Sequence, residues 1–380
     1  MIYFDNNATT AVAPEVFEAM KPFLTAEYGN PSSAHSAGVV TRKAVAAARE
    51  KVATLLGAAS ASEIVFTSCG TESDNWALLG GLQARPDKDH IVTTRVEHEA
   101  VRKLVEQLEA SGFRVTWLDV DEGGLVDLAK VADAVNESTA IVSVMLANNE
   151  TGVLFPVKEI AELVKERSNA LMHVDGVNAA GKVPIDLRNS SIDLFSISAH
   201  KFHGPKGIGA LYVRRGIQLP SYLTGGGQES GQRAGTEAVH QIVGMGASAE
   251  LASSLSKMEQ VRKLRDGLET GILSAIPNTK LNGTADADRR LPNTSNISFE
   301  NTNGEMLLAR LDDIGVCVST GSACNAQGHV ASPVLAAMNV PYSFAMGSIR
   351  FSLGKFNTDE EVNYVLERLP GIVGEFRAIG

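Results

Sequence analysis

Short apolar runs alternate with helical patterns through the first half of the chain. The apolar runs predict strands, and the segments between them show the apolar spacing that is typical of helices. The predicted strands are residues 64–67, 91–94, 113–118, 140–146 and 171–175, and the predicted helices are residues 75–82, 100–108, 128–135 and 157–165. This alternation favours an α/β fold in which helices cover both faces of a mostly parallel sheet.

Polar residues follow several of these strands directly. In open parallel sheets, ligands bind beyond the carboxyl ends of the strands. The polar residues at such positions are Thr71, His98, Asn149, Asp175 and residues 198–201. We therefore expect them to contribute to one site.

Lys201 lies just beyond another predicted strand, residues 193–198. A turn containing Gly204 and Pro205 separates it from the next predicted strand, residues 210–213. Burial in such a turn lowers the pKa of a lysine and frees its amine to form a Schiff base. Taken alone, a lysine in a glycine-rich turn is more often an ordinary surface residue, so the neighbouring polar residues carry the argument.

Length, charge and cysteine content limit the class of protein. A chain of 380 residues can form two domains, and its net charge of −10 argues against direct binding of nucleic acid. The sequence has no run of about 18 apolar residues, so we expect no membrane span. Three cysteines are too few for a disulfide framework and no signal peptide is expected, which favours a cytoplasmic protein.

A change of domain is predicted within the long helical region at about residues 239–276. The later part of the chain mixes predicted strands and helices in the manner of an α+β domain. We expect a large domain of residues 13–255 and a small domain formed by residues 1–12 and 256–380.

The strand-end residues match the needs of a flat, anionic aldehyde cofactor. Pyridoxal 5'-phosphate (PLP) is carried by a lysine and needs a carboxylate at its ring nitrogen, and Lys201 and Asp175 are the candidates. His98 is the candidate for stacking on the ring and exchanging protons. The candidates for phosphate contacts are Thr71, Ser198, His200 and Thr236. Asp175 as a strand-end cap and His98 as a helix cap are the plainer alternatives.

Short motifs spread over nearly the whole chain resemble those of one enzyme family. They are residues 5–10, 29–33, 66–73, 97–98, 148–152, 174–175, 198–201, 204–209, 233–236, 319–324 and 348–352. In this order and spacing, the chain resembles the NifS/IscS-type cysteine desulfurases, which are class V aminotransferases and fold-type I PLP enzymes, and it is most similar to the NifS-like branch.

The resemblance implies a fold and a set of residue roles. The fold is a mostly parallel seven-stranded sheet between helices, with a smaller α+β domain. Lys201 would carry PLP, with His98 over its ring and Asp175 at its nitrogen. Arg350 would bind the substrate carboxylate, and Cys324 would accept sulfur as a persulfide. The further cofactor residues are Gly70, Thr71, Asn149, Asn178, Ser198, His200 and Thr236, and Asn149 would also contact substrate.

The implied reaction is PLP-dependent removal of sulfur from L-cysteine, which yields L-alanine and a persulfide on Cys324. The sulfur would pass to an acceptor or scaffold protein, with iron–sulfur cluster assembly favoured over tRNA thiolation or DNA phosphorothioation. No resident metal is expected, although Cys324 could ligate an iron–sulfur cluster transiently. A homodimer is implied, in which Thr236 serves the partner's cofactor.

Other activities remain open on the residues alone. They are a selenocysteine lyase or aminotransferase of the same fold and a PLP-binding scaffold without turnover. Two departures from the family pattern also matter. Asn178 stands where relatives usually have glutamine near the ring hydroxyl, and residues 325–333 differ from the usual loop after the persulfide cysteine.

Overall fold

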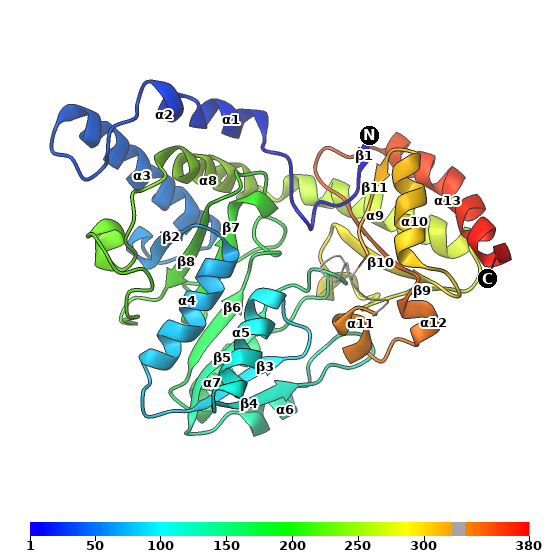
Figure 1. Ribbon diagram of the computed structural model, residues 1–380, viewed down its shortest axis with the longest axis horizontal. Coiled ribbons are helices and arrows are strands. Elements are labelled where there is room, and N and C mark those ends of the chain that lie inside the picture. The colour runs from blue at the N-terminus through cyan, green and yellow to red at the C-terminus, as the bar shows by residue number, and fades with distance from the viewer. Residues whose placement is uncertain (321–330, 380) are drawn as a thin grey trace.

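The chain folds into two lobes in the computed structural model, which describes residues 1–320 and 331–379. The larger lobe contains an extensive sheet, and the smaller lobe carries both chain ends (Figure 1). No helix in the described part of the chain is long and apolar enough to cross a membrane. Cys324 lies outside the described residues.

Seven strands form the sheet of the larger lobe in the order β2-β8-β7-β6-β5-β3-β4. Their bounds are β2 (Ile64–Thr67), β3 (His90–Thr94), β4 (Arg114–Leu118), β5 (Thr139–Met145), β6 (Leu171–Asp175), β7 (Leu194–Ser198) and β8 (Gly209–Val213). Strands β4, β3, β5, β6 and β7 pair in parallel, whereas β8 is antiparallel to β7 and β2. The predicted α/β fold with a mostly parallel seven-stranded sheet is therefore confirmed.

Helices cover both faces of this sheet, because successive side chains of each buried strand point to opposite faces. In β6, Leu171 packs with α4 (Gly70–Gln83) and α5 (Glu99–Ala110), whereas Met172 and Val174 belong to the core on the other face. The helices of that other face are α3 (Ser36–Leu55), α6 (Leu128–Ala134), α7 (Val157–Arg167) and α8 (Val239–Ala252). Helix α1 (Pro14–Met20) and helix α2 (Pro22–Thr25) pack against α8.

The smaller lobe has a separate apolar core. Its antiparallel sheet has the order β12-β10-β9, and a parallel pair joins β1 to β11. The strands are β1 (Ile2–Tyr3), β9 (Thr279–Leu281), β10 (Thr294–Phe299), β11 (Val316–Cys317) and β12 (Ser348–Ser352). The helices are α9 (Ser256–Ala275), α10 (Gly304–Asp313), α11 (Pro333–Ala337), α12 (Tyr342–Ala345) and α13 (Asp359–Ile379). Phe4, Leu268, Phe299 and Phe351 lie in this core, so the two ends of the chain fold together.

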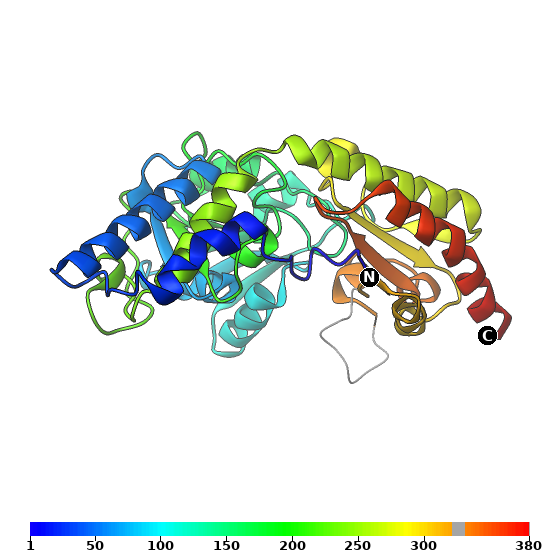
Figure 2. The same cartoon turned by 90° about the horizontal axis from the view of Figure 1, so that it is seen from above.

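Backbone connections join the two lobes. The chain passes from α8 to α9 through residues 253–255, and an N-terminal segment runs back between the lobes (Figure 2). In that segment the N–H of Asn6 donates to the carbonyl of Ser352 at 2.9 Å, and the N–H of Thr10 donates to the carbonyl of His200 at 2.9 Å. The N-terminal segment therefore ties β12 to the turn after β7.

Close backbone packing around Gly209 provides a test of this fold. A Cβ atom at Gly209 would lie 2.7 Å from the carbonyl carbon of Cys69 and 2.9 Å from the carbonyl oxygen of Ile197. Backbone atoms cannot move aside as a side chain can, and overpacking costs about 1–3 kcal/mol. We expect Gly209→Ala to lower the free energy of unfolding by about that amount in urea denaturation.

The matched control is Gly267→Ala in α9, where a Cβ atom meets nothing within 4 Å in the described part of the chain. Alanine is favoured over glycine inside a helix by about 0.8–1 kcal/mol, so this variant should be slightly more stable than the wild type. Equal stability of Gly209→Ala and wild type would contradict the packing argument.

Candidate active site

The predicted site residues meet at a cavity of about 280 Å³ at the carboxyl edge of the large sheet. The predicted residues that line it are Gly70, Thr71, His98, Asn149, Asp175, Asn178, Ser198, His200 and Lys201. An adjoining cavity of about 330 Å³ shares His98, Asn149 and Lys201 with the first and adds Arg350. A larger cavity of about 610 Å³ lies near the start of α7 and residues 287–290, but none of the predicted site residues lines it.

Two further predicted residues are Thr236 and Cys324. Thr236 lies in an exposed loop and lines neither site cavity. Its predicted service to a partner subunit's cofactor stays a prediction. Cys324 cannot be located relative to the cavities, because it lies outside the described residues.

Lys201 ends the short turn that follows β7, and its side chain lies against the N-terminal segment. Its Nζ atom donates to the carbonyl oxygens of Asn7 at 2.5 Å and Ala8 at 3.1 Å. Burial, with a smaller contribution from the charge of Lys201, lowers the pKa of the neighbouring His98 and His200. Lys201 lines both cavities.

Asp175 ends β6 and is almost fully buried. Its Oδ1 atom accepts a hydrogen bond from the N–H of Val177 at 2.9 Å. Burial raises the pKa of Asp175 to about 6, the nearby Asp74 adds to this shift, and His98 opposes it. A buried carboxyl group with a raised pKa favours a cationic partner, which a protonated pyridine nitrogen would supply.

His98 caps α5 and also lines both cavities. Its Nδ1 atom accepts a hydrogen bond from the N–H of Ala100 at 3.1 Å. Since Nδ1 is an acceptor, a neutral imidazole carries its proton on Nε2. Burial, with a smaller contribution from Lys201, lowers the pKa of His98, which favours that neutral form. The capping role and the role in the site are thus compatible.

The first turn of α4 forms one wall of the cavity of about 280 Å³. Its N-cap, Cys69, makes no side-chain capping bond, which leaves the helix N-terminus available to an anion. A Cβ atom at Gly70 would lie 2.7 Å from Cγ2 of Val177, so only glycine fits there without a shift. Burial lowers the pKa of His200 to about 4, and its Nδ1 atom lies 3.2 Å from the hydroxyl of Thr9. His200 therefore acts at neutral pH as an uncharged hydrogen-bonding group.

Asn178 retains a hydrogen-bond donor beside the cavity despite its short side chain. The Nζ atom of Lys182 donates to its Oδ1 atom at 2.9 Å and to the carbonyl oxygen of Asn178 at 3.0 Å. Burial, together with the charges of Lys201 and Arg350, lowers the pKa of Lys182. With Oδ1 accepting from Lys182, the other end of the amide is the nitrogen. The Nδ2 atom is buried and has no hydrogen-bond partner among the described residues. It can therefore donate to an oxygen of a bound cofactor.

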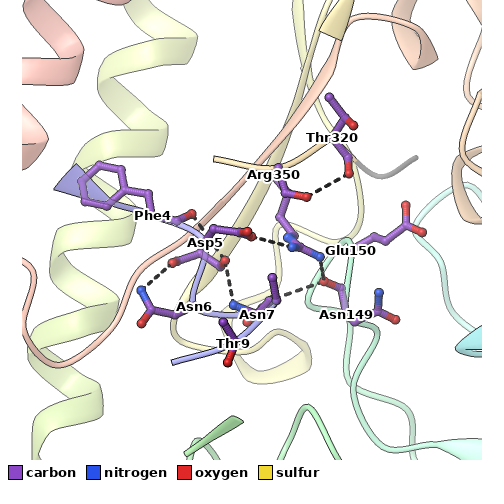
Figure 3. A network of polar contacts seen from close by, with 12 residues as sticks. Phe4, Asp5, Asn6, Asn7, Thr9, Asn149, Glu150, Thr320 and Arg350 are labelled. Carbon is purple, nitrogen blue, oxygen red and sulfur yellow. Dashed lines mark hydrogen bonds and ion pairs between the residues drawn. The ribbon is translucent and has the colours of Figure 1, made fainter. Parts of the chain in front are cut away.

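Arg350 lies in β12 with only 7% of its side chain exposed. Its Nη2 atom forms an ion pair of 2.7 Å with Oδ1 of Asp5, and its Nη1 atom donates to the carbonyl oxygen of Asn149 at 2.9 Å (Figure 3). The guanidinium therefore joins the smaller lobe, the N-terminal segment and the edge of the large sheet.

Buried carboxyl groups at this edge include Asp74 and Glu97, which no sequence pattern indicated. Burial raises the pKa of Asp74 to about 7, and its Oδ1 atom has no hydrogen-bond partner among the described residues. Oδ1 lies 3.5 Å from Nε2 of His173, but burial lowers the pKa of His173 to about 4, so this contact is no ion pair at neutral pH. Burial also raises the pKa of Glu97 to about 8. Both carboxyls are near predicted site residues in sequence, but their burial depends on the packing of α4 and β5.

Comparison with known proteins gives a consistent result. Residues 2–365 match the class V aminotransferase family. The chain is 51% identical over 380 residues to cysteine desulfurase 2 of Trichormus variabilis, covering 100% of this chain and 94% of that protein. It is 47% identical to the cysteine desulfurase NifS of Azotobacter vinelandii with the same coverage.

Solved structures agree with these relatives. A NifS-like protein has a TM-score of 0.92 and 41% identity, with 98% of this chain and 99% of that chain covered. A structure of SspA in complex with cysteine has a TM-score of 0.83 and 34% identity, with 94% of this chain and 100% of that chain covered.

Glu97 gives a prediction for the cofactor-free protein. Its folded pKa of about 8 lies above the ordinary value of 4.5, so the folded state holds a proton that the unfolded state has lost between these pH values. This contribution to stability is full below pH 4.5 and declines as pH rises through about 8. Each pH unit in that window costs about 1.4 kcal/mol.

The variant Glu97→Gln should remove this decline, because glutamine does not titrate and its Oε1 atom can still accept from Thr94 and Met145. Urea unfolding at pH 5.5 and 7.5 should show a pH dependence smaller than that of the wild type by roughly 2–3 kcal/mol. An unchanged difference between the two pH values would mean that Glu97 is ionised in the folded protein.

Proposed function

Because the chain belongs to the class V aminotransferase family, we propose that it is a cysteine desulfurase, which takes sulfur from L-cysteine and leaves L-alanine. The main structural support is the meeting of Lys201, Asp175 and His98 at one cavity. The relatives named cysteine desulfurase match the whole chain, which supports the same activity here.

We further propose PLP as the cofactor, since each part of the cavity fits one part of that molecule. The uncapped start of α4 and the glycine at position 70 fit a phosphate group. The unpartnered Nδ2 atom of Asn178 fits an oxygen acceptor, and the buried Asp175 fits a protonated ring nitrogen. Lys201 would hold the aldehyde carbon. When bound, PLP supplies an electron sink that stabilises negative charge next to the amino group of the substrate.

The chain's own residues bind the substrate and move protons. Arg350 binds the substrate carboxylate, for which a planar guanidinium is suited. The amine of Lys201, once released by the incoming amino acid, removes the proton from Cα. Asp175 keeps the pyridine nitrogen protonated through its buried negative charge. His98 can exchange a proton through Nε2, because Nδ1 is engaged with the N–H of Ala100.

Cys324 is the proposed sulfur acceptor on the strength of the family resemblance. The thiolate of Cys324 attacks the sulfur of the substrate, and the Cβ–S bond breaks. The electron pair of that bond stays on Cβ, which takes up a proton to give alanine. The sulfur remains as a persulfide on Cys324. Ser319, Thr320, Pro333 and Val334, which lie on either side of Cys324 in sequence, line the Arg350 cavity. This supports the proposed approach of the thiol to the substrate.

Delivery of the sulfur to iron–sulfur cluster assembly through an acceptor or scaffold protein is the favoured destination. Relatives named NifS and IscS, which are 47–48% identical over nearly the whole chain, support it. A cytoplasmic homodimer also belongs to this proposal, with the exposed Thr236 facing the partner subunit's cofactor. Release of alanine and sulfide without any keto acid would separate a desulfurase from an aminotransferase.

Two substitutions test the proposed roles after reconstitution with PLP. Lys201→Ala should lose both the visible Schiff-base absorption and the formation of alanine. Cys324→Ser should keep the absorption but lower alanine formation by roughly 100-fold or more, because the acceptor nucleophile is lost. Alanine and sulfide are measured together in the presence of a thiol reductant.

Cys317→Ser is the matched control, because Cys317 lies in β11 and lines neither site cavity. It should react at the wild-type rate. If Cys324→Ser also formed alanine at the wild-type rate, Cys324 would not be the acceptor.

A further inference from the structure

We propose that Asp5 is an internal counter-ion of Arg350 that sets how tightly the site holds the carboxylate of its substrate and its product. The proposal rests on the proposed function, because it takes Arg350 as the group that binds the carboxylate of L-cysteine. Asp5 thereby controls the affinity for carboxylates and takes no part in the chemistry at Lys201.

Hydrogen bonds on both sides of Asp5 hold its carboxylate beside Arg350. The N–H of Ser352 donates to the carbonyl of Phe4 at 2.7 Å, and the N–H of Asn6 donates to the carbonyl of Ser352 at 2.9 Å. The N–H of Asn7 donates to the hydroxyl of Ser352 at 2.9 Å. Figure 3 shows the resulting arrangement, in which the segment around Asp5 lies along β12 and its carboxylate faces the guanidinium. Asp5 cannot move away without breaking these contacts.

Arg350 still has donors for a second carboxylate. A guanidinium has five N–H groups, of which one on Nη2 serves Asp5 and one on Nη1 serves the carbonyl of Asn149. The Nε atom is buried and has no hydrogen-bond partner among the described residues. The geometry therefore leaves N–H groups for the substrate, although Asp5 already balances the positive charge.

The low exposure of this pair makes its charge balance important. Only 7% of the Arg350 side chain and 18% of the Asp5 side chain are exposed, so water screens their charges less than it would at the surface. An incoming carboxylate meets the attraction of Arg350 and the repulsion of Asp5 together. Asp5 therefore orients the guanidinium while it weakens the binding of any further carboxylate.

Other arginines at this cavity have their own acidic partners. Arg95 pairs with Asp119 at 2.7 Å, and Arg102 pairs with Glu106 at 2.6 Å. Both pairs are more exposed than the pair of Arg350 and Asp5. Neither Arg95 nor Arg102 is therefore a better counter-charge than Arg350 for the substrate carboxylate.

Cysteine and alanine carry the same carboxylate, so Asp5 weakens the binding of both. The affinity for the substrate L-cysteine is reduced, and the affinity for the product L-alanine is reduced with it. The substitution Asp5→Asn separates the two effects of Asp5, since the amide oxygen can still accept from Nη2 while the negative charge is gone.

The test measures carboxylate affinity at equilibrium. The PLP-bound protein is titrated with L-alanine, and the change in visible absorption gives the dissociation constant. We expect Asp5→Asn to lower that constant about tenfold, which corresponds to 1.4 kcal/mol, and to lower KM for L-cysteine by a similar factor. Binding of cysteamine, which has the amine and thiol of cysteine without the carboxylate, should change by less than twofold.

Two further variants complete the experiment. Asp89 forms an exposed ion pair with Arg114 at the opposite end of the strands, with 2.6 Å between Oδ1 and Nη2. Asp89→Asn removes one negative charge there and should leave the dissociation constant for alanine within twofold of that of the wild type. Asp5→Ser removes the same charge as Asp5→Asn with a different side chain, and it decides the matter if Asp5→Asn does not fold.

The proposal is overturned if a folded Asp5 variant binds alanine no more tightly than the wild type, or if cysteamine binding changes as much as alanine binding. This failure differs from failure of the proposed function. If only the proposal for Asp5 fails, the wild type still releases sulfide from cysteine. If the proposed function fails, the wild type releases no sulfide.

Discussion

The parallel register of β5, β6 and β7 is the constraint on which the site depends. Met145 pairs with Asp175, and Asp175 pairs with Ser196, so β5 and β6 end side by side and β7 continues to Ser198. Asp175 is thereby placed between the loop that carries Asn149 and the turn that carries Lys201. Helix α4 packs on the face of the sheet beside this edge, and the carboxyl groups of Asp74 and Asp175 are both buried there. Their burial therefore depends on how α4 packs against the strands.

The N-terminal segment lies against this edge and links it to the smaller lobe. It hydrogen-bonds to β12 through Asn6 and to the turn after β7 through Thr10, and its carbonyls at Asn7 and Ala8 accept from Lys201. The small lobe is thus held where Arg350 reaches the cavity. The same segment carries Asp5, so one short stretch of chain both positions Arg350, which we propose to bind the substrate carboxylate, and pairs with its charge.

The sequence predicted the sheet and most of the cavity, because both follow from local patterns. Alternating apolar runs predicted the parallel strands, and the rule that ligands bind at strand ends brought His98, Asp175 and Lys201 to one edge. The antiparallel insertion of β8 between β2 and β7 could not be predicted from such patterns, since pairing partners depend on long-range packing. The same holds for the contact between Asp5 and Arg350, which joins residues 345 positions apart. The burial of Asp74 and Glu97 could not be predicted from the sequence either, because water is excluded from them only when the helices pack.

We propose that Lys201 carries the aldehyde of the cofactor, and a buried lysine nearby makes this proposal sharply testable. Lys182 also lies close to the cavity, where it donates to Asn178 and Asn7. Borohydride converts a Schiff base into a stable secondary amine, which peptide mapping by mass spectrometry can locate in the PLP-reconstituted protein. The account predicts a phosphopyridoxyl group on Lys201 alone. Modification of Lys182, or of no lysine in a protein that has bound PLP, would contradict it.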